Sequence, residues 1–162
     1  GRPGKEELAR QLIHEIRETE GIYSVADMML HSYGPERYSG SVNVEVDHKK
    51  TIGEVYEFLH ELQLRIMHEY GVTLVFGIYA VDEDSDYMRQ LRSTIAEFAR
   101  NHEHIKSYHA VYLSKASGRI YCDFIVDYNL NDWDALEAEF AEYMGERYPD
   151  NTIELTIETE FV

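Results

Sequence analysis

Two periodicities of apolar residues divide the first half of the chain into helices and strands. Strict alternation is clearest where Val42, Val44 and Val46 share one face of a strand. Thr51 and Glu54 form a capping box that starts the most regular helix. The predicted elements are a helix at 5–19, strands at 23–31 and 38–47, a helix at 51–71 and a strand at 72–79. Their order is αββαβ.

The second half of the chain repeats this order after the acidic stretch 82–86, which contains no apolar residue. The pattern of residues 42–47 matches that of residues 122–127, which suggests a duplication. The predicted elements are a helix at 88–98, strands at 107–114 and 119–128, a helix at 133–143 and a strand at 153–161. We therefore expect an α+β protein with two domains, 1–81 and 82–162, each a three-stranded sheet with two helices on one face.

The sheet faces that the helices leave open also carry large side chains. Tyr79, Tyr121 and Ile125 are predicted to lie on these faces. Side chains of this size favour partial burial, so the pattern predicts contact between the two units or a homodimer.

Composition narrows the class of partner. Thirty-one acidic against fifteen basic residues give a formal net charge of −16, which repels nucleic acid and attracts divalent cations. The single cysteine, Cys122, cannot form an internal disulfide and is expected in a core. No apolar run reaches membrane-spanning length, and the chain begins without Met, so we expect a soluble piece of a longer protein.

Three segments of the first half resemble the cytoplasmic domain of cation diffusion facilitators, the cation efflux family. Residues 21–27 (G-I-Y-S-V-A-D) correspond to a family segment G-V-x-x-x-H-D-L, residues 31–35 (H-S-Y-G-P) to a turn H-x-Y-G-P, and residues 41–47 (S-V-N-V-E-V-D) to a strand S-V-H-V-E-V-D. The second half resembles an extension of some bacterial members, at residues 108–111, 122–126 and 158–161.

This resemblance implies a ferredoxin-like, metallochaperone-like domain that lies on the cytoplasmic face of the cell membrane. It would belong to a divalent metal cation/proton antiporter, whose transmembrane domain is part of the same parent chain. In the family the domain forms homodimers that bound divalent cations, such as zinc or manganese, bring together. It is not an enzyme.

The sequence departs from the family at the positions of the regulatory metal ligands. Ala26, Asn43, Tyr56, Gly77 and Tyr79 stand where relatives carry His or Asp. Zinc needs three or four His, Cys or carboxylate ligands, so the usual site is expected to be lost. Two interpretations remain open: a metal-independent dimerisation scaffold, or metal sensing elsewhere in the domain.

The remaining histidines give no convincing ligand set. Asp47 with His48, or His102 with His104, could share an ion, but two ligands without a third would hold zinc or manganese weakly. The other histidines are expected to be surface or structural residues: His14, His31, His60, His68 and His109. We therefore assign no catalytic, cofactor-binding or metal-ligating residue.

Enzyme motifs are absent from the sequence, and one alternative to the transporter domain remains. There is no G-x-S-x-G, H-E-x-x-H or C-x-x-C motif and no phosphate-binding glycine loop. Tandem ferredoxin-like units can also bind small molecules between paired sheets, and thirteen tyrosines could line such a pocket. The alternative is thus a small-molecule-binding regulatory module.

Overall fold

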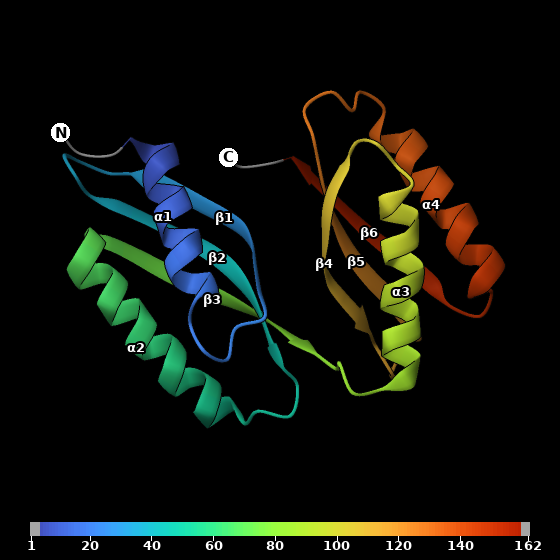
Figure 1. Cartoon of the computed structure of the whole chain (residues 1–162), viewed down its shortest axis with the longest axis horizontal. Helices are drawn as coiled ribbons and strands as arrows, with labels where there is room; N and C mark the ends of the chain where they lie inside the picture. Colours follow the sequence, from blue (N-terminus) through green and yellow to red (C-terminus); the bar gives the residue numbers. More distant parts are fainter. Residues whose placement is uncertain (1–3, 160–162) are drawn as a thin grey trace. The chain divides into compact units, whose positions relative to one another are not determined.

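The computed structural model describes residues 4–159 and divides the chain into two compact units, the first reaching Asp82 and the second starting at Glu83. Unit 1 contains α1 (Lys5–Arg17), β1 (Ser24–Ser32), β2 (Tyr38–Asp47), α2 (Ile52–Tyr70) and β3 (Val72–Val81). Unit 2 contains α3 (Asp86–Arg100), β4 (Ile105–Leu113), β5 (Arg119–Val126), α4 (Trp133–Arg147) and β6 (Thr152–Thr159). The predicted α+β class and the repeated αββαβ order are confirmed (Figure 1).

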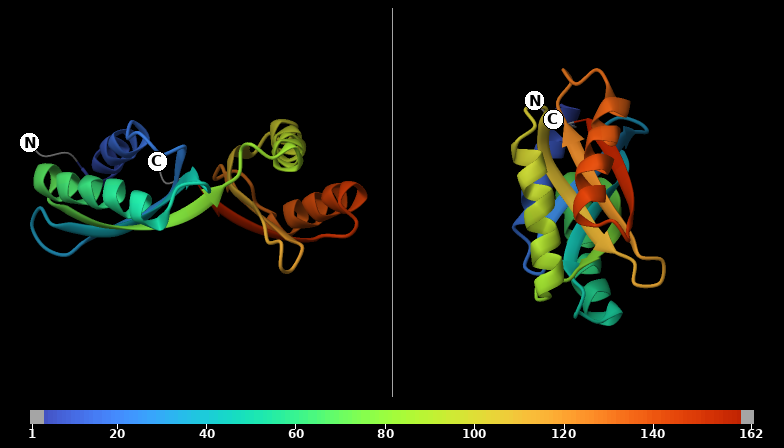
Figure 2. Two further views of the ribbon diagram at one scale, coloured as in Figure 1. Left: turned by 90° about the horizontal axis from the view of Figure 1, so that it is seen from below. Right: turned by 90° about the vertical axis from the view of Figure 1, so that its right-hand side faces the viewer.

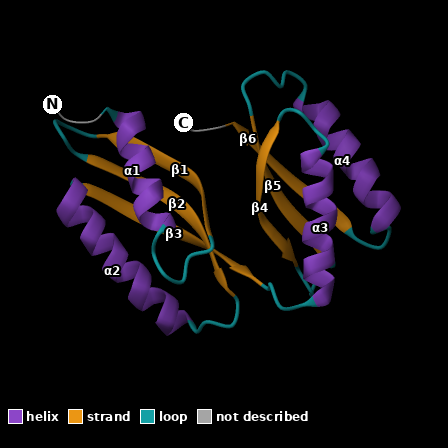
Figure 3. Cartoon of the chain, viewed as in Figure 1, coloured by secondary structure: helices purple, strands orange, loops and turns teal. Residues whose placement is uncertain are grey.

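The two sheets have the same topology. Their strand orders are β1-β2-β3 and β4-β5-β6, with the first pair of each sheet antiparallel and the second pair parallel. A parallel pair needs a long crossover, which α2 and α4 supply (Figure 3). In unit 1, α1 and α2 lie on the same side of the sheet (Figure 2, left). The arrangement of each unit is compatible with a ferredoxin-like fold.

Local signals fix both ends of α2. The hydroxyl of Thr51 accepts a hydrogen bond from the Glu54 N–H at 3.1 Å, and the Glu54 carboxylate accepts one from the Thr51 N–H at 3.1 Å. The hydrogen bond from the Thr51 N–H lowers the pKa of the Glu54 carboxyl below its ordinary value, and the hydrogen bond with the Thr51 hydroxyl lowers it further. Gly71 ends the helix in the left-handed region at φ 68°. The predicted capping box is confirmed.

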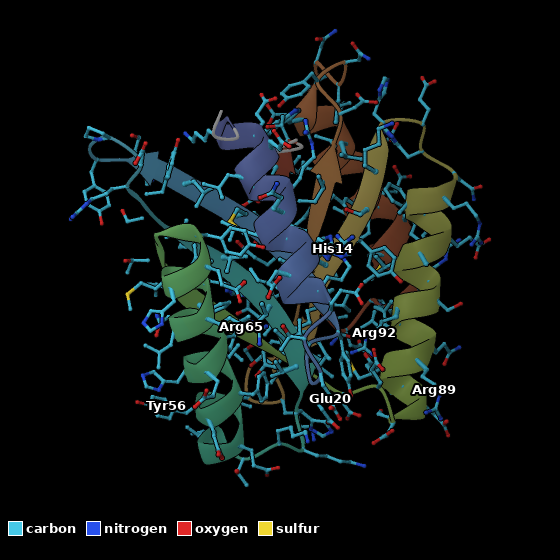
Figure 4. The ribbon with its side chains drawn as sticks, turned by 60° about the vertical axis from the view of Figure 1, so that its left-hand side comes forward. His14, Glu20, Tyr56, Arg65, Arg89 and Arg92 are labelled. Carbon is cyan, nitrogen blue, oxygen red and sulfur yellow. The ribbon has the colours of Figure 1, made fainter. Side chains whose placement is uncertain are left out.

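The core of unit 1 lies between the helices and the inner face of the sheet. Val42, Val44 and Val46 all point into it, as their alternation predicts. They pack with buried residues from both helices, among them Leu12, Ile16, Leu62 and Ile66. At the surface, Arg65 of α2 pairs with Glu15 of α1 at 2.9 Å, and Figure 4 shows its place on the helix.

The core of unit 2 is built around aromatic rings. The ring of Phe140 lies 4.8 Å from that of Phe124 and 5.0 Å from that of Phe98, measured between centroids. Phe124 and Phe140 are fully buried. Cys122 lies in the same core at 1% exposure, which confirms its predicted place.

Several element ends differ from the sequence prediction, and one has a clear cause. The strand predicted over 119–128 ends at Val126 because Asp127 starts a turn, in which its carboxylate accepts a hydrogen bond from the Asn129 N–H at 3.0 Å. The last strand ends at Thr159, and residues 160–161 of the predicted strand lie outside the described residues.

A pair of β-bulges was not predicted. The register shifts between Ala26 and Met29 in β1, where Asp27 has φ 58°. A similar shift in β4 lies beside Ala110, which has φ 56°. Left-handed backbone is uncommon outside glycine, and a bulge re-aims the side chains next to it. The bulge in unit 1 places the Asp27 carboxylate beside Asn43 on the open face of its sheet.

Candidate functional site

A polar network occupies the open face of the sheet in unit 1. The side-chain amide of Asn43, on β2, donates hydrogen bonds to the Asp27 carboxylate at 2.8 Å and to the Tyr79 hydroxyl at 3.3 Å. Asp27 comes from the bulge in β1 and Tyr79 from β3, so all three strands contribute. We call Asp27, Asn43 and Tyr79 the open-face network.

Gly77 makes room for this network. It pairs with Asn43 across β2 and β3, and a Cβ atom at Gly77 would lie only 2.1 Å from the side-chain oxygen of Asn43. Any larger residue at this position would displace the Asn43 amide. The glycine and the amide therefore depend on one another.

Four of the five positions where the resemblance places metal ligands lie in the open-face network or directly beside it. Asn43, Gly77 and Tyr79 come together on the open face, and Ala26 pairs with Asn43 across the strands. Tyr56 lies instead on α2, where its ring stacks on that of His60 at 5.3 Å. An amide, a phenol and one carboxylate are a poor donor set for zinc.

The Asp27 carboxylate keeps one acceptor without a partner. Its second oxygen, Oδ1, is buried and accepts no hydrogen bond from the described residues. A buried unsatisfied acceptor costs about 1–3 kcal/mol. This oxygen is the buried acceptor of the open-face network that has no donor among residues 4–159.

The equivalent face of unit 2 carries a different set of side chains. Its strand register pairs His109 with Asp123, just as Ala26 pairs with Asn43 in unit 1. Asp123 is 8% exposed, and it is the one buried charged residue among residues 4–159. The ring of His109 lies within 3.1 Å of the Ser107 hydroxyl. Sequence reasoning weighed His109 but missed Asp123, for which the matched pattern of 42–47 and 122–127 was the available signal.

The two candidate ion-binding pairs, Asp47 with His48 and His102 with His104, have other contacts within the structure. The Asp47 carboxylate accepts a hydrogen bond from the Lys49 N–H at 2.9 Å, and His48 lies 3.4 Å from the Asp82 carboxylate. The ring of His102 accepts a hydrogen bond from the His104 N–H at 3.3 Å. The rings of His102 and His104 are 6.0 Å apart. Across residues 4–159, no three His, Cys, Asp or Glu side chains gather in a way that could hold a metal ion.

His104 forms a close pair with Asp127. Its Nδ1 lies 3.0 Å from the Asp127 carboxylate, and since a carboxylate only accepts, this nitrogen carries the proton. Partial burial works to raise the pKa of Asp127, but the hydrogen bonds from His104 and from the Asn129 N–H, together with the charges of His104 and Lys106, hold it below its ordinary value.

This pair predicts acid sensitivity in unit 2. A lowered folded-state pKa contributes stability that is present above the ordinary value, near 3.8, and is lost as the pH falls through the lower folded value. We expect His104→Gln to flatten the loss of stability between about pH 5 and 3, measured by urea unfolding. The exposed His68→Gln is the control. Equal pH profiles for His104→Gln and the unmodified chain would contradict the prediction.

An apolar groove lies beside β3 in unit 1. It encloses about 520 Å³ between the N-terminal half of α2 and the C-terminal half of β3. Its lining includes Tyr56, Leu59, Phe76, Ile78 and Ala80. A volume of this size is within the range of small-molecule sites. The groove was not predicted, because it depends on how α2 sits over the edge of the sheet.

Comparisons with known proteins add no assignment to this geometry. None of the helices in residues 4–159 is long and apolar enough to cross a membrane. No protein-family model matches the chain, and no curated protein matches it significantly.

Proposed function

We propose that the chain is the cytoplasmic regulatory and dimerisation domain of a divalent metal cation efflux transporter, in which hydrogen bonds have replaced the regulatory metal site. The observation that carries this proposal is the open-face network. It lies where the resemblance to cation diffusion facilitators places metal ligands, and it includes the amide of Asn43 in place of a histidine. Dimerisation would then need no bound metal.

The proposal assigns different roles to the transmembrane part of the parent protein and to this domain. The transmembrane part of the parent protein exchanges cations for protons, and this domain holds two copies together on the cytoplasmic face of the membrane. It carries out no chemistry on a substrate. The gene is expected to encode six apolar helices upstream of Gly1, and a parent without them would contradict the proposal.

Calorimetry tests the loss of the metal site. We expect titration of the purified chain with Zn²⁺ or Mn²⁺ to show no saturable binding at micromolar affinity, which corresponds to about −8 kcal/mol. Light scattering in the same buffer is expected to show a dimer. Tight binding by the unmodified chain would contradict the metal-independent proposal.

A gain-of-function variant makes this test sharper. Asn43→His together with Tyr79→Asp would place two ligand types beside the Asp27 carboxylate, so that three ligands meet on one face. Gly77 leaves space for the new imidazole. We expect this double variant to bind Zn²⁺ at least about tenfold more tightly than the unmodified chain. The exposed pair Thr73→His with Val75→Asp on β3 is the control and should gain nothing.

The groove supports a second candidate function. Its apolar lining and its volume of about 520 Å³ favour a small-molecule-binding regulatory module. On this alternative, a ligand with an apolar body would raise the thermal stability of unit 1. Ala80→Trp, which fills the groove from an exposed position on β3, would abolish that rise.

A further inference from the structure

The outer edge of β3 is covered near Leu74, where Gln63 of α2 bonds the carbonyl, but its C-terminal half lacks the features that normally protect an edge strand. Natural edge strands avoid pairing with other chains through charged residues, proline or bulges, or through a helix or loop that covers the edge. The ten residues Val72–Val81 include no charge and no proline, and they pair with β2 in unbroken register. The edge is long, regular and uncharged.

The other edge strands in residues 4–159 do carry such features. β1 has its bulge and Asp27, β4 has two register shifts and Lys106, and β6 has Glu154 and Glu158. Protection is therefore the rule in this chain, and β3 departs from it. A strand without protection is expected to be paired in the working form of the protein.

Two hydrogen bonds show which backbone groups of β3 face outwards. The Val81 carbonyl accepts from the His48 N–H at 2.9 Å, on the side of β2. The Leu74 carbonyl accepts from the side chain of Gln63, which lies on α2. Because successive residues of a strand point their backbone groups to opposite sides, the groups of Phe76, Ile78 and Ala80 face the free edge.

The side chains along this edge are exposed and apolar. Ile78 is 53% exposed on β3, and Ile52 and Tyr56 of α2 are 90% and 65% exposed beside it. All three line the groove. Figure 4 shows Tyr56 near the start of α2. Backbone groups and apolar side chains are thus available along the same edge.

We propose that β3 pairs with β3 of a second copy of this chain, antiparallel and centred on Ile78, to form one six-stranded sheet. The Leu74 carbonyl is already occupied, so the pairing register that uses the free groups sets Ile78 opposite itself and Phe76 opposite Ala80. A two-fold axis perpendicular to the sheet relates the copies, which is the common symmetry of homodimers. This inference rests on the dimerisation part of the proposed function and names its surface.

The two-fold axis also explains the groove. It keeps both helix layers on the same side of the joint sheet, so the grooves of the two copies meet above the paired strands. Ile52 and Tyr56 of each copy then lose contact with water. Burial of apolar area is the main favourable contribution to such an interface.

The net charge of each copy makes dimerisation depend on ionic strength. Each copy carries a formal charge of −16, which opposes association, whereas β3 itself is uncharged. Salt screens the long-range repulsion, with a Debye length of about 8 Å at physiological ionic strength, and leaves the apolar contact intact. We therefore expect the dimer to tighten as salt is added, opposite to an interface held by ion pairs.

Sedimentation equilibrium of two matched variants tests the surface. Ile78→Lys places two ammonium groups at the two-fold axis and should weaken dimerisation by about a hundredfold, since like charges in contact cost several kcal/mol. Met29→Lys is the control, because Met29 has the same 53% exposure on β1, the opposite edge of the sheet. Circular dichroism checks that both variants fold.

The outcomes separate this inference from the proposed function. Dimers of equal strength for Ile78→Lys and the unmodified chain would overturn the β3 surface and leave metal-independent dimerisation standing. A monomeric unmodified chain at every salt concentration would overturn both. Ile78→Cys should form a disulfide-linked dimer under oxidation, because paired residues in antiparallel strands lie about 5.5 Å apart between Cα atoms. Met29→Cys should form no such dimer. A disulfide-linked dimer of Met29→Cys together with none of Ile78→Cys would also overturn the inference.

Discussion

Replacing Phe140 with alanine is expected to destabilise unit 2 by about 3–5 kcal/mol, the cost of deleting a fully buried aromatic ring. Phe140 has no exposed area, and its ring packs against Phe98 and Phe124. Urea unfolding followed by fluorescence measures the effect, since the chain's one tryptophan, Trp133, lies in α4 of this unit.

A surface change on the same helix serves as the control for Phe140→Ala. Glu142 is exposed on α4, and Glu142→Ala should change the unfolding free energy by less than about 0.5 kcal/mol. A loss below about 1 kcal/mol for Phe140→Ala would show that the aromatic cluster does not carry the core. Because the cores of the two units consist of separate residues, unit 1 is expected to keep its own stability.

Gly40→Ala is expected to destabilise unit 1 by about 3 kcal/mol, at the upper end of the cost of overpacking. Gly40 faces Leu30 across the β1–β2 pair, and an added Cβ would lie 1.9 Å from the Met29 carbonyl oxygen. That atom belongs to the backbone and cannot rotate away, so the strands must separate locally. Thermal unfolding of the single variant, followed by circular dichroism, measures the loss.

Gly53 provides a control of opposite sign. It lies in the first turn of α2, where an added Cβ has no neighbour closer than the Thr51 hydroxyl at 3.9 Å. Alanine favours the helix over glycine, so Gly53→Ala should stabilise unit 1 by up to about 1 kcal/mol. If both alanine variants shifted stability in the same direction, the close contact at Gly40 would be refuted.

The regular elements could be predicted from sequence because their signals are local. The alternation of Val42, Val44 and Val46 and the capping box of Thr51 with Glu54 each involve residues a few positions apart, and both are confirmed. The bulges could not be predicted in this way. The left-handed backbone of Asp27 and Ala110 follows from how β1 and β4 meet their partner strands, which a single strand's pattern does not record.

The candidate site was predictable as a set of positions and not as an arrangement. The resemblance pointed to Asn43, Gly77 and Tyr79, and β2 and β3 do bring them together. The hydrogen bond from Asn43 to Asp27 depends on the bulge, and the dependence of Asn43 on Gly77 appears only when a Cβ is placed on the structure. Contacts across three strands carry no signature along any one of them.

The consecutive order of the two units has a consequence for biosynthesis. Each sheet is built from strands of its own unit, and the three strands of unit 1 all precede Asp82. Domains generally fold as units, the N-terminal one first, while the ribosome is still adding residues. Unit 1 can therefore complete its sheet before unit 2 has fully emerged from the ribosome, and its β3 edge would then be available to a neighbouring nascent chain on the same messenger RNA.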